Sequence, residues 1–322
     1  MAFSWMGRWS STDWVVALYT SATALLIVTC YPAIPGPGAG WLLAFHGGVL
    51  GLLFLLPPRG AAWEQPRPGE PGWRRVPKEV GRFLRYTYPA LLILPFFEEV
   101  QYTVNAVAPK TPYWFEPYLY AADRWIFGDI PSVLLSPWVG PPVSEIVHGF
   151  YFSYYLILIC GVVLAWVGPG TGELGRRTPG PGFETAMTAM MLGFFLSFLW
   201  YPWLPARGPW ENVALMARLP RFEGTFFTPL VEWIIERGSV SGGCFPSSHV
   251  SGSWGLVLGL VPTHRRAGLG LSLLVAAMSL SCIYTRYHHA VDVPAGLLAG
   301  VVGAALGRAL TRRPRGPLGP QH

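Results

Sequence analysis

Residues 268–309 decide the fold of this chain and read GLGLSLLVAAMSLSCIYTRYHHAVDVPAGLLAGVVGAALGRA. In this stretch two long apolar runs enclose one short polar segment. The runs at 268–287 and 291–309 are each about 20 residues long, which is enough for a helix to cross the hydrocarbon core of a bilayer. The segment where they meet, residues 284–292, carries an arginine, two histidines and an aspartate. This pattern predicts two transmembrane helices joined by a polar turn at one membrane face.

Composition places the whole chain in a membrane. Of its 322 residues, 52% are hydrophobic and 12% are charged, whereas soluble domains carry about 25% charged residues. The basic residues lie between apolar runs rather than on one soluble face, so the formal charge of +6 does not indicate nucleic-acid binding. We expect an all-α polytopic membrane helix bundle of about eight transmembrane helices, at residues 14–34, 41–57, 84–107, 145–166, 185–203, 249–262, 268–287 and 291–309.

One integrated membrane domain with three parts is expected: N-terminal transmembrane helices with an interfacial segment (1–144), a catalytic helix bundle (145–310) and a cytoplasmic tail (311–322). The first apolar run ends near Cys30, as a lipoprotein signal does. However, Thr29 stands before Cys30 where such signals have a smaller residue, so we interpret the run as a retained transmembrane helix. The four cysteines are scattered and predict neither a disulfide framework nor a zinc motif.

The placement of lysine and arginine predicts the orientation, because cytoplasmic loops hold an excess of both. With the N-terminus inside, 16 of the 23 basic residues are cytoplasmic: one in 1–13, seven in 58–85, two in 167–184, two in 263–267 and four from Arg308 onward. Both termini are then cytoplasmic. We expect the protein in the inner membrane of a bacterium, with its active site facing the extracytoplasmic side.

Two outer segments mix aromatic and charged residues. Residues 112–136 contain Asp123, Arg124 and Asp129, and residues 225–237 read TFFTPLVEWIIER. Such amphipathic stretches lie along the membrane interface, where Trp and Tyr are favoured. We therefore predict extracytoplasmic interfacial helices in both segments.

Three polar clusters fall at the outer ends of predicted spans: residues 205–209, 243–249 and 284–292. Consecutive spans alternate in direction, so all three clusters reach a similar depth on one side of the membrane. Residues far apart in the sequence are therefore expected to form a single site.

The residue types in these clusters suit phosphoryl transfer, which needs positive charge and oriented donors around the phosphate oxygens. Arg207 and Arg286 offer planar guanidinium groups that match such oxygens. Ser247 and Ser248 add hydroxyl donors at the start of a predicted helix, where backbone N–H groups also favour anions. We predict these four residues as phosphate-binding.

Two histidines and an aspartate supply the reacting groups. His288 and Asp292 are four residues apart, so they face the same side if both lie in the first turn of a helix. The carboxylate then holds one ring nitrogen, and the other is free to attack phosphorus. His249 can protonate the leaving oxygen. We predict all three residues as catalytic.

The sequence resembles the type-2 phosphatidic acid phosphatase superfamily, whose motifs are K-x6-R-P, P-S-G-H and S-R-x5-H-x3-D. Residues 246–249 read P-S-S-H, and residues 288–292 read H-x3-D. The resemblance implies that His288 becomes phosphorylated, that Asp292 orients it and that His249 is the acid. It also implies a membrane-embedded lipid phosphatase that works without a metal ion or another cofactor.

Three departures from these motifs favour a phosphotransferase beside a phosphatase. Trp200 stands where the first motif has lysine, Gly208 interrupts the R-P pair, and Cys282 stands where the third motif has arginine. Arg286 follows one helical turn later, on the same face of a continuous helix. The strings F-P-S-x-H-V and R-Y-H-x3-D-V are similar to the inositol phosphorylceramide synthase branch, which transfers head groups between lipids.

The other histidines and two glutamates carry weaker signals. His46 and His264 are interpreted as packing residues, and His289 as a neighbour of the site that packs or touches substrate. Three further groups stay open between packing and contact with a head group: His148, Glu98 and Glu99.

Two functions fit the pattern. The first is a lipid phosphatase or head-group phosphotransferase acting through a phosphohistidine, with a lipid phosphate or phosphodiester as substrate and membrane lipids as partners. The second is a non-catalytic protein that binds or transports lipid phosphates, which the missing lysine and Cys282 support. The His288–Asp292 pair favours the enzyme, because a binding protein needs cations more than a nucleophile. The lipid, the acceptor (water or a lipid alcohol) and the oligomeric state stay open.

Overall fold

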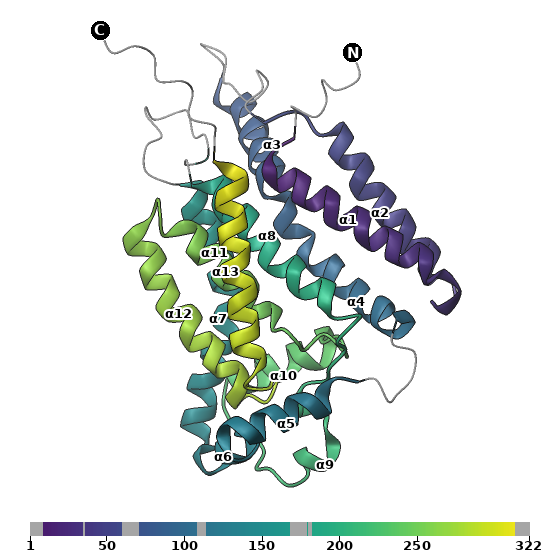
Figure 1. Cartoon of the computed structure of the whole chain (residues 1–322). Coiled ribbons are helices and arrows are strands. Elements are labelled where there is room, and N and C mark those ends of the chain that lie inside the picture. The colour runs from purple at the N-terminus through teal and green to yellow at the C-terminus, as the bar shows by residue number, and fades with distance from the viewer. Residues whose placement is uncertain are drawn as a thin grey trace.

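The computed structural model describes residues 9–34, 36–59, 71–107, 114–167, 179 and 182–312, so the predicted tail lies almost wholly outside it. The described residues form an all-α bundle, as predicted (Figure 1). Six helices are long and apolar enough to cross a membrane: α1 (Ser11–Thr29), α2 (Gly38–Leu55), α7 (Pro141–Trp166), α8 (Phe183–Trp200), α12 (Arg265–Tyr284) and α13 (Asp292–Thr311). The chain is an integral membrane protein.

The predicted span at 84–107 consists of two helices. α3 (Gly72–Leu91) ends at Leu91, and α4 (Ile93–Val107) begins two residues later. Pro89 and Pro95 flank the break, and proline weakens a helix because it lacks a backbone N–H. The prediction of one continuous helix over this segment was therefore wrong.

Helices α8, α11 (Ser248–Leu260) and α13 pack with almost no side chain between them. A Cβ at Gly193 of α8 would lie 2.4 Å from the carbonyl oxygen of Ser251, and one at Gly296 of α13 would lie 2.5 Å from that of Ser247. Only glycine permits backbones to approach so closely, as in many membrane helix pairs. These contacts bring the start of α13 beside the start of α11.

The short helix α11 begins inside the bundle. Its 13 residues span about 20 Å, since each residue adds 1.5 Å, whereas the hydrocarbon core is about 30 Å thick. The residues at its N-terminal end are covered, with Ser247 0% and Ser248 5% exposed. The first turn of α11 is thus held at depth rather than at the protein surface.

The two ends of the bundle differ. At one end lie the short helices α5 (Glu116–Phe127), α6 (Pro131–Leu134), α9 (Val213–Met216) and α10 (Phe227–Gly238) (Figure 1). Both predicted interfacial segments therefore contain helices. At the other end α1 begins where α13 finishes, and Ser11 Oγ donates to the carbonyl oxygen of Leu310 at 2.9 Å.

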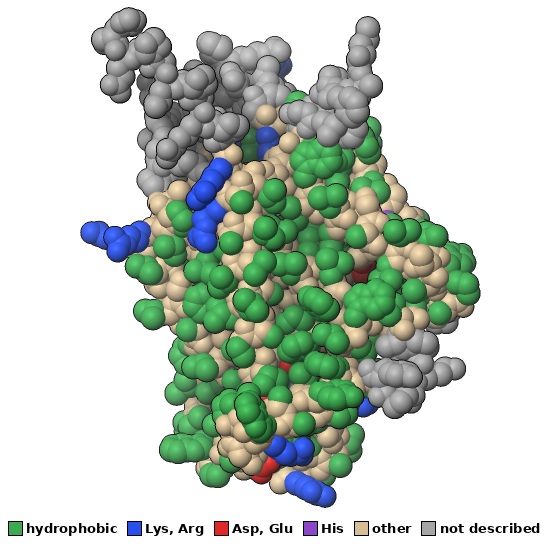
Figure 2. All heavy atoms as spheres, in the orientation of Figure 1, with side chains coloured by type: hydrophobic (Ala, Val, Ile, Leu, Met, Phe, Trp, Pro, Cys, Tyr) green, Lys and Arg blue, Asp and Glu red, His purple; other side chains and the backbone are tan. Residues whose placement is uncertain are grey.

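The middle of the surface is apolar. In Figure 2 hydrophobic side chains cover the central band of the visible face, and lysine and arginine lie towards the two ends. The large apolar side chains that are more than 60% exposed include Leu18, Leu25, Leu273 and Leu298, which come from three helices. An apolar surface of this extent is stable only when lipid chains cover it.

A buried carboxylate joins α1 to α3. Asp13 is 0% exposed. It accepts hydrogen bonds from Arg85 Nη1 at 3.0 Å, from Arg85 Nη2 at 2.8 Å and from the Tyr88 hydroxyl at 2.7 Å. Both partners lie in α3. A fully paired carboxylate is tolerated in such a place, but a charge left there without its partner is costly.

We expect Asp13→Ala to destabilise the protein by about 3–5 kcal/mol, because it leaves the Arg85 guanidinium unpaired and buried. Thermal unfolding of the detergent-solubilised protein would report this as a lower midpoint. Glu236→Ala is the control, since the Glu236–Arg237 pair has side chains 70% and 59% exposed and such pairs contribute about 0–1 kcal/mol. Equal midpoints for Asp13→Ala and the unchanged protein would contradict the assignment.

Candidate active site at the start of helix α11

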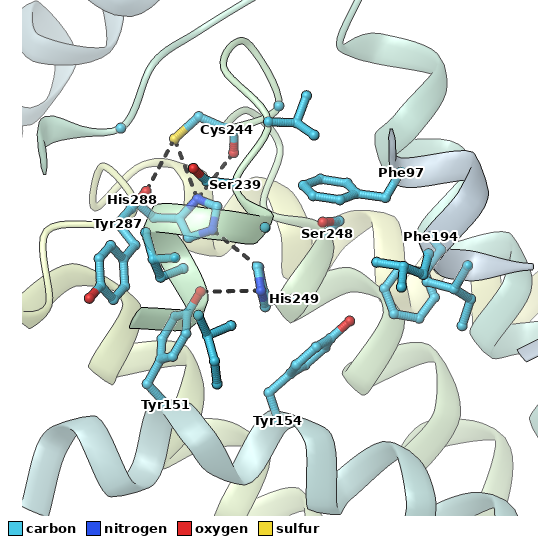
Figure 3. A pocket seen from close by; sticks show the side chains of 18 of the residues that line it. Phe97, Tyr151, Tyr154, Phe194, Ser239, Cys244, Ser248, His249, Tyr287 and His288 are labelled. Carbon is cyan, nitrogen blue, oxygen red and sulfur yellow. Dashed lines mark hydrogen bonds between the residues drawn. The ribbon is translucent and has the colours of Figure 1, made fainter. Parts of the chain in front are cut away.

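A cavity of about 480 Å³ lies between α4, α7, α8 and α10, within the range of small-molecule sites. One end carries His249 and His288 (Figure 3). The rest of the wall is mainly apolar and aromatic and includes Ile93, Leu94, Phe97, Tyr154, Leu158, Phe194 and Phe198. The cavity therefore brings the two histidine rings next to an apolar compartment.

A sharp turn places His288. α12 ends at Tyr284, and Arg286 has φ 68°, a left-handed conformation that residues other than glycine rarely adopt. The backbone N–H of His288 then donates to the carbonyl oxygen of Cys282 at 3.1 Å. Because α13 begins only at Asp292, His288 lies in the turn before the helix and not in its first turn.

The structure brings the three predicted catalytic residues together. His288 Nδ1 lies 3.3 Å from Asp292 Oδ2, and His288 Nε2 lies 3.5 Å from His249 Nδ1. Ser247 Oγ is 3.2 Å from the same Nε2. The carboxylate next to Nδ1 favours the tautomer with its proton there. The lone pair of Nε2 is then directed towards His249 and the cavity.

Tyr151 completes the surroundings of His249. Its hydroxyl lies 3.2 Å from His249 Nε2, and the Tyr154 ring packs 4.5 Å from the His249 ring between centroids. Both tyrosines come from α7. Neither tyrosine was predicted from the sequence, because a tyrosine within an apolar span carries no motif.

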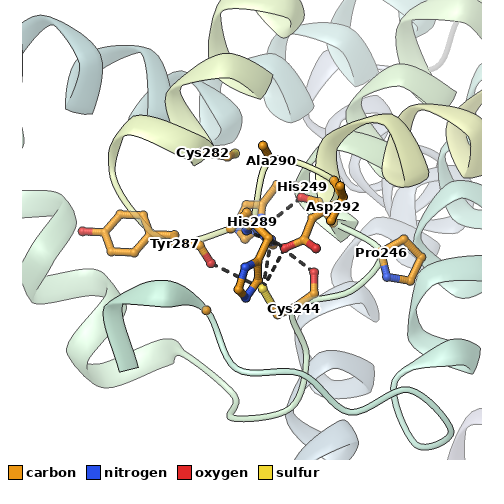
Figure 4. A network of polar contacts seen from close by, with 12 residues as sticks. Cys244, Pro246, His249, Cys282, Tyr287, His289, Ala290 and Asp292 are labelled. Atoms are coloured by element: carbon orange, nitrogen blue, oxygen red, sulfur yellow. Dashed lines mark hydrogen bonds and ion pairs between the residues drawn. The ribbon is translucent and has the colours of Figure 1, made fainter. Parts of the chain in front are cut away.

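Cys244 is a further neighbour that the motifs did not indicate. Its Sγ donates to Asp292 Oδ2 at 2.9 Å and lies 3.5 Å from His288 Nδ1 (Figure 4). Burial, together with the Asp292 carboxylate, raises the pKa of the Cys244 thiol well above its usual range. The thiol therefore keeps its proton and acts as a donor to the carboxylate.

These three side chains are also metal-ligand types. One ligand atom each from Cys244, His288 and Asp292 lie within 4.8 Å of one another. Zinc sites in enzymes use three protein ligands of these kinds. In the structure the three atoms are linked instead by the hydrogen bonds of a protonated thiol and an Nδ1–H imidazole.

Helix α5 holds the turn that carries His288. Asp123 is 0% exposed and accepts hydrogen bonds from the backbone N–H groups of Ala290 at 3.2 Å and Val291 at 3.1 Å. Its carboxylate is 3.7 Å from His289 Nδ1. Although burial acts in the opposite direction, contact with Asp123 raises the pKa of His289. Asp123 was noted in the interfacial segment, but nothing in the sequence paired it with His289.

Arg286, predicted to bind phosphate, lies elsewhere. Its side chain is buried, its Nη2 donates to the carbonyl oxygen of Pro220 at 2.9 Å, and its guanidinium packs 4.2 Å from the Phe222 ring centroid. The expectation that Arg286 extends a helical face from Cys282 fails, because α12 ends before it. Arg286 does not line the cavity.

Arg207 borders a second, polar chamber of about 340 Å³. Its guanidinium pairs with Glu116 of α5 and lies 4.7 Å from the Trp114 ring centroid. Glu211 lines both this chamber and the first cavity, and burial raises its pKa. The structure thus keeps both predicted arginines outside the histidine cavity, and their contact with phosphate stays a prediction.

The predicted serines lie at the site. Ser247 contacts His288, and Ser248 lines the cavity at the first residue of α11. Of the groups left open by the sequence, Glu99 pairs with His46 at 3.2 Å. His148 Nδ1 lies 2.7 Å from the carbonyl oxygen of Ser144. Neither lines the cavity.

Comparison with curated proteins and with solved structures gave no match. A family model described as the PAP2 superfamily matches residues 117–306, which is more than half of the chain. The match runs from α5 into α13 and includes all three polar clusters. The resemblance seen in the two histidine motifs is confirmed: this chain belongs to the PAP2 superfamily of phosphatase-type membrane enzymes.

Proposed function

We propose that this protein transfers the phosphoryl group of a lipid phosphate ester through a phosphohistidine formed on His288, without a metal ion. Membership of the PAP2 superfamily supports a phosphatase-type activity. The observation that carries the finer proposal is the position of His288, with Nδ1 at Asp292 and Nε2 facing His249 across the cavity.

Two steps follow from this geometry. His288 Nε2 attacks phosphorus, a P–N bond forms, the P–O bond to the leaving group breaks, and His249 gives its proton to the leaving oxygen. Water or an alcohol then attacks phosphorus, the P–N bond breaks, and the proton of the acceptor passes to His249. Asp292 stabilises the positive charge that develops on the His288 ring.

A lipid substrate is supported by the wall of the cavity. From Tyr151 to Leu158, α7 descends about 10 Å at 1.5 Å per residue, and both residues line the cavity. Phe97 of α4 and Phe198 of α8 line it as well. A phosphate held at the histidines therefore has an apolar compartment beside it for an acyl or prenyl chain.

The distribution of charge supports an extracytoplasmic site. Arg59 and Arg85 lie beside Asp13 at the start of α1, and Arg308 lies in the last turn of α13. These basic residues mark the end of the bundle opposite to α5 and α10 (Figure 1). By the excess of basic residues on the cytoplasmic side, the histidine cavity faces outward.

The alternative of a non-catalytic binding protein has less support. Such a protein holds phosphate mainly with arginine and lysine, and no lysine or arginine is among the described residues that line the cavity. A cavity that holds an oriented nucleophile and an acid, but no lysine or arginine side chain among its described lining residues, favours catalysis over storage of the ligand.

Replacement of the nucleophile tests the proposal. We expect His288→Ala to reduce turnover of lipid phosphates by roughly 10³-fold or more, since the covalent route is lost. The unchanged enzyme, quenched during turnover, should carry acid-labile phosphate. His264→Ala is the control, because His264 lies next to the turn into α12 and contacts Thr263. Full activity of His288→Ala would remove the nucleophile assignment.

Chelation tests independence from metal ions. We expect activity to survive EDTA, because the histidine pair and the N-terminus of α11 act on phosphate without a bridging cation. The rate of phosphate or lipid-alcohol release is measured before and after dialysis against the chelator. Loss of activity that Mg²⁺ or Zn²⁺ restores would contradict metal independence.

Sidedness is tested by thiol labelling in right-side-out vesicles. Cys244 is only 5% exposed, so Ser241→Cys at an exposed neighbouring position is the better reporter. We expect an impermeant maleimide to label Ser241→Cys from outside and Arg266→Cys only after inversion, in proteins with serine at Cys30 and Cys160. The reverse pattern would place the site on the cytoplasmic side.

A further inference from the structure

Three atoms that can bind a metal ion, one sulfur, one nitrogen and one oxygen, lie together on the Nδ1 side of His288. Cys244 Sγ lies 2.9 Å from Asp292 Oδ2 and 3.5 Å from His288 Nδ1, and His288 Nδ1 lies 3.3 Å from Asp292 Oδ2. All three side chains are buried. The mechanism uses the imidazole and the carboxylate, but it assigns no chemical step to the thiol.

The spacing of these atoms is close to that of a tetrahedral zinc site. Zinc lies about 2.3 Å from sulfur and 2.0–2.2 Å from nitrogen or oxygen, which puts tetrahedral ligands about 3.3–3.6 Å apart. Two of the three observed separations, 3.5 and 3.3 Å, are already in this range. Only the S···O contact of 2.9 Å has to open when an ion replaces the thiol proton between them.

A second observation, an Asp292 oxygen without a hydrogen-bond partner, points to a ligand at the same place. Asp292 is 0% exposed, and its Oδ1 has no hydrogen-bond partner within the described structure. A buried carboxylate oxygen without a partner is unusual. A cation held by Asp292 compensates this charge, and a water molecule on the ion has a ready acceptor in Oδ1.

The ion has a route to these atoms. Cys244 and His288 both line the 480 Å³ cavity, so a hydrated ion that enters the cavity arrives beside the residues that would bind it. The three protein ligands leave the fourth tetrahedral position for water.

We propose that Cys244, His288 and Asp292 form an inhibitory site for a thiophilic divalent cation such as Zn²⁺ or Cd²⁺. This inference rests on the proposed function, because it blocks the same histidine. Binding releases the thiol proton to solvent and moves the single ring proton of His288 from Nδ1 to Nε2, so that the metal occupies the places of both protons.

The inhibition follows from the imidazole tautomer. With the metal on Nδ1, the remaining ring proton of a neutral imidazole resides on Nε2. His288 Nε2 then has no lone pair with which to attack phosphorus. The ion also binds the Asp292 carboxylate, which otherwise stabilises the charged ring. Nucleophile and orienting group are therefore lost together.

Cysteine replacement in a metal titration tests the site, with serine at Cys30 and Cys160 in every protein. Cd²⁺ is titrated into the purified enzyme, and ultraviolet thiolate-to-metal absorption and turnover are followed together. We expect absorption to rise as turnover falls, and EDTA to reverse both. Cys244→Ser should lose the absorption and raise the half-inhibitory concentration about tenfold or more relative to its own metal-free rate. Cys244→Ala, assayed in the same way, covers the case in which Cys244→Ser does not fold.

Cys282→Ser is the matched control, because Cys282 is equally buried but bonds within α12 to the carbonyl oxygen of Met278. It should behave as the unchanged protein. Unaltered inhibition in the Cys244 variants, absorption that depends on Cys282, or stimulation of turnover by the metal would each overturn the inference. If no lipid phosphate is turned over, Cys244-dependent absorption supports the site by itself, and only the proposed function fails.

Discussion

The close approach of α11 and α13 is the constraint on which the site depends. No side chain separates Gly296 from the Ser247 carbonyl, and the Ser247 N–H donates to the carbonyl oxygen of Asp292 at 3.3 Å. These backbone contacts bring the P-S-S-H segment and the H-x3-D segment together within the bundle. A larger residue at position 296 would separate the helices, and with them His249 from His288.

Carboxylates connect the surrounding elements to this centre. Asp123 of α5 accepts two backbone N–H groups of the turn after His288. Glu145 of α7 accepts the N–H groups of Phe226, Phe227 and Thr228 at the start of α10. Hydrogen bonds to a charged acceptor are shorter and stronger than those to a neutral one. The interfacial helices are thus oriented by charge-assisted contacts as well as by apolar packing, which suits elements with one face in lipid and one in water.

Other groups stand at this site where the family motifs have cationic side chains. Trp200 and Cys282 stand where the family motifs have cations, and Arg207 and Arg286 are engaged with Glu116 and with Pro220. Donors at the cavity include Ser248, the two histidines, Tyr151 and the N-terminal turn of α11, whose dipole is equivalent to about half a positive charge. Helix α4, which lies outside the family match, completes the apolar wall.

The sequence by itself determined the membrane-spanning class, the positions of most helices and the identity of the His288, Asp292 and His249 group. These follow from local quantities: the length of apolar runs, and residue spacing within single motifs. The break between α3 and α4 has a local cause in Pro89 and Pro95, which the apolar pattern did not register. Tertiary structure alone decided the place of Arg286, which has a left-handed backbone conformation and lies outside the cavity. It also decided the partners of the reactive residues. Cys244 and Asp292 are 48 residues apart, Tyr151 and His249 98, and Asp123 and Val291 168. Contacts across such separations depend on how helices pack, and no local pattern in the chain records them.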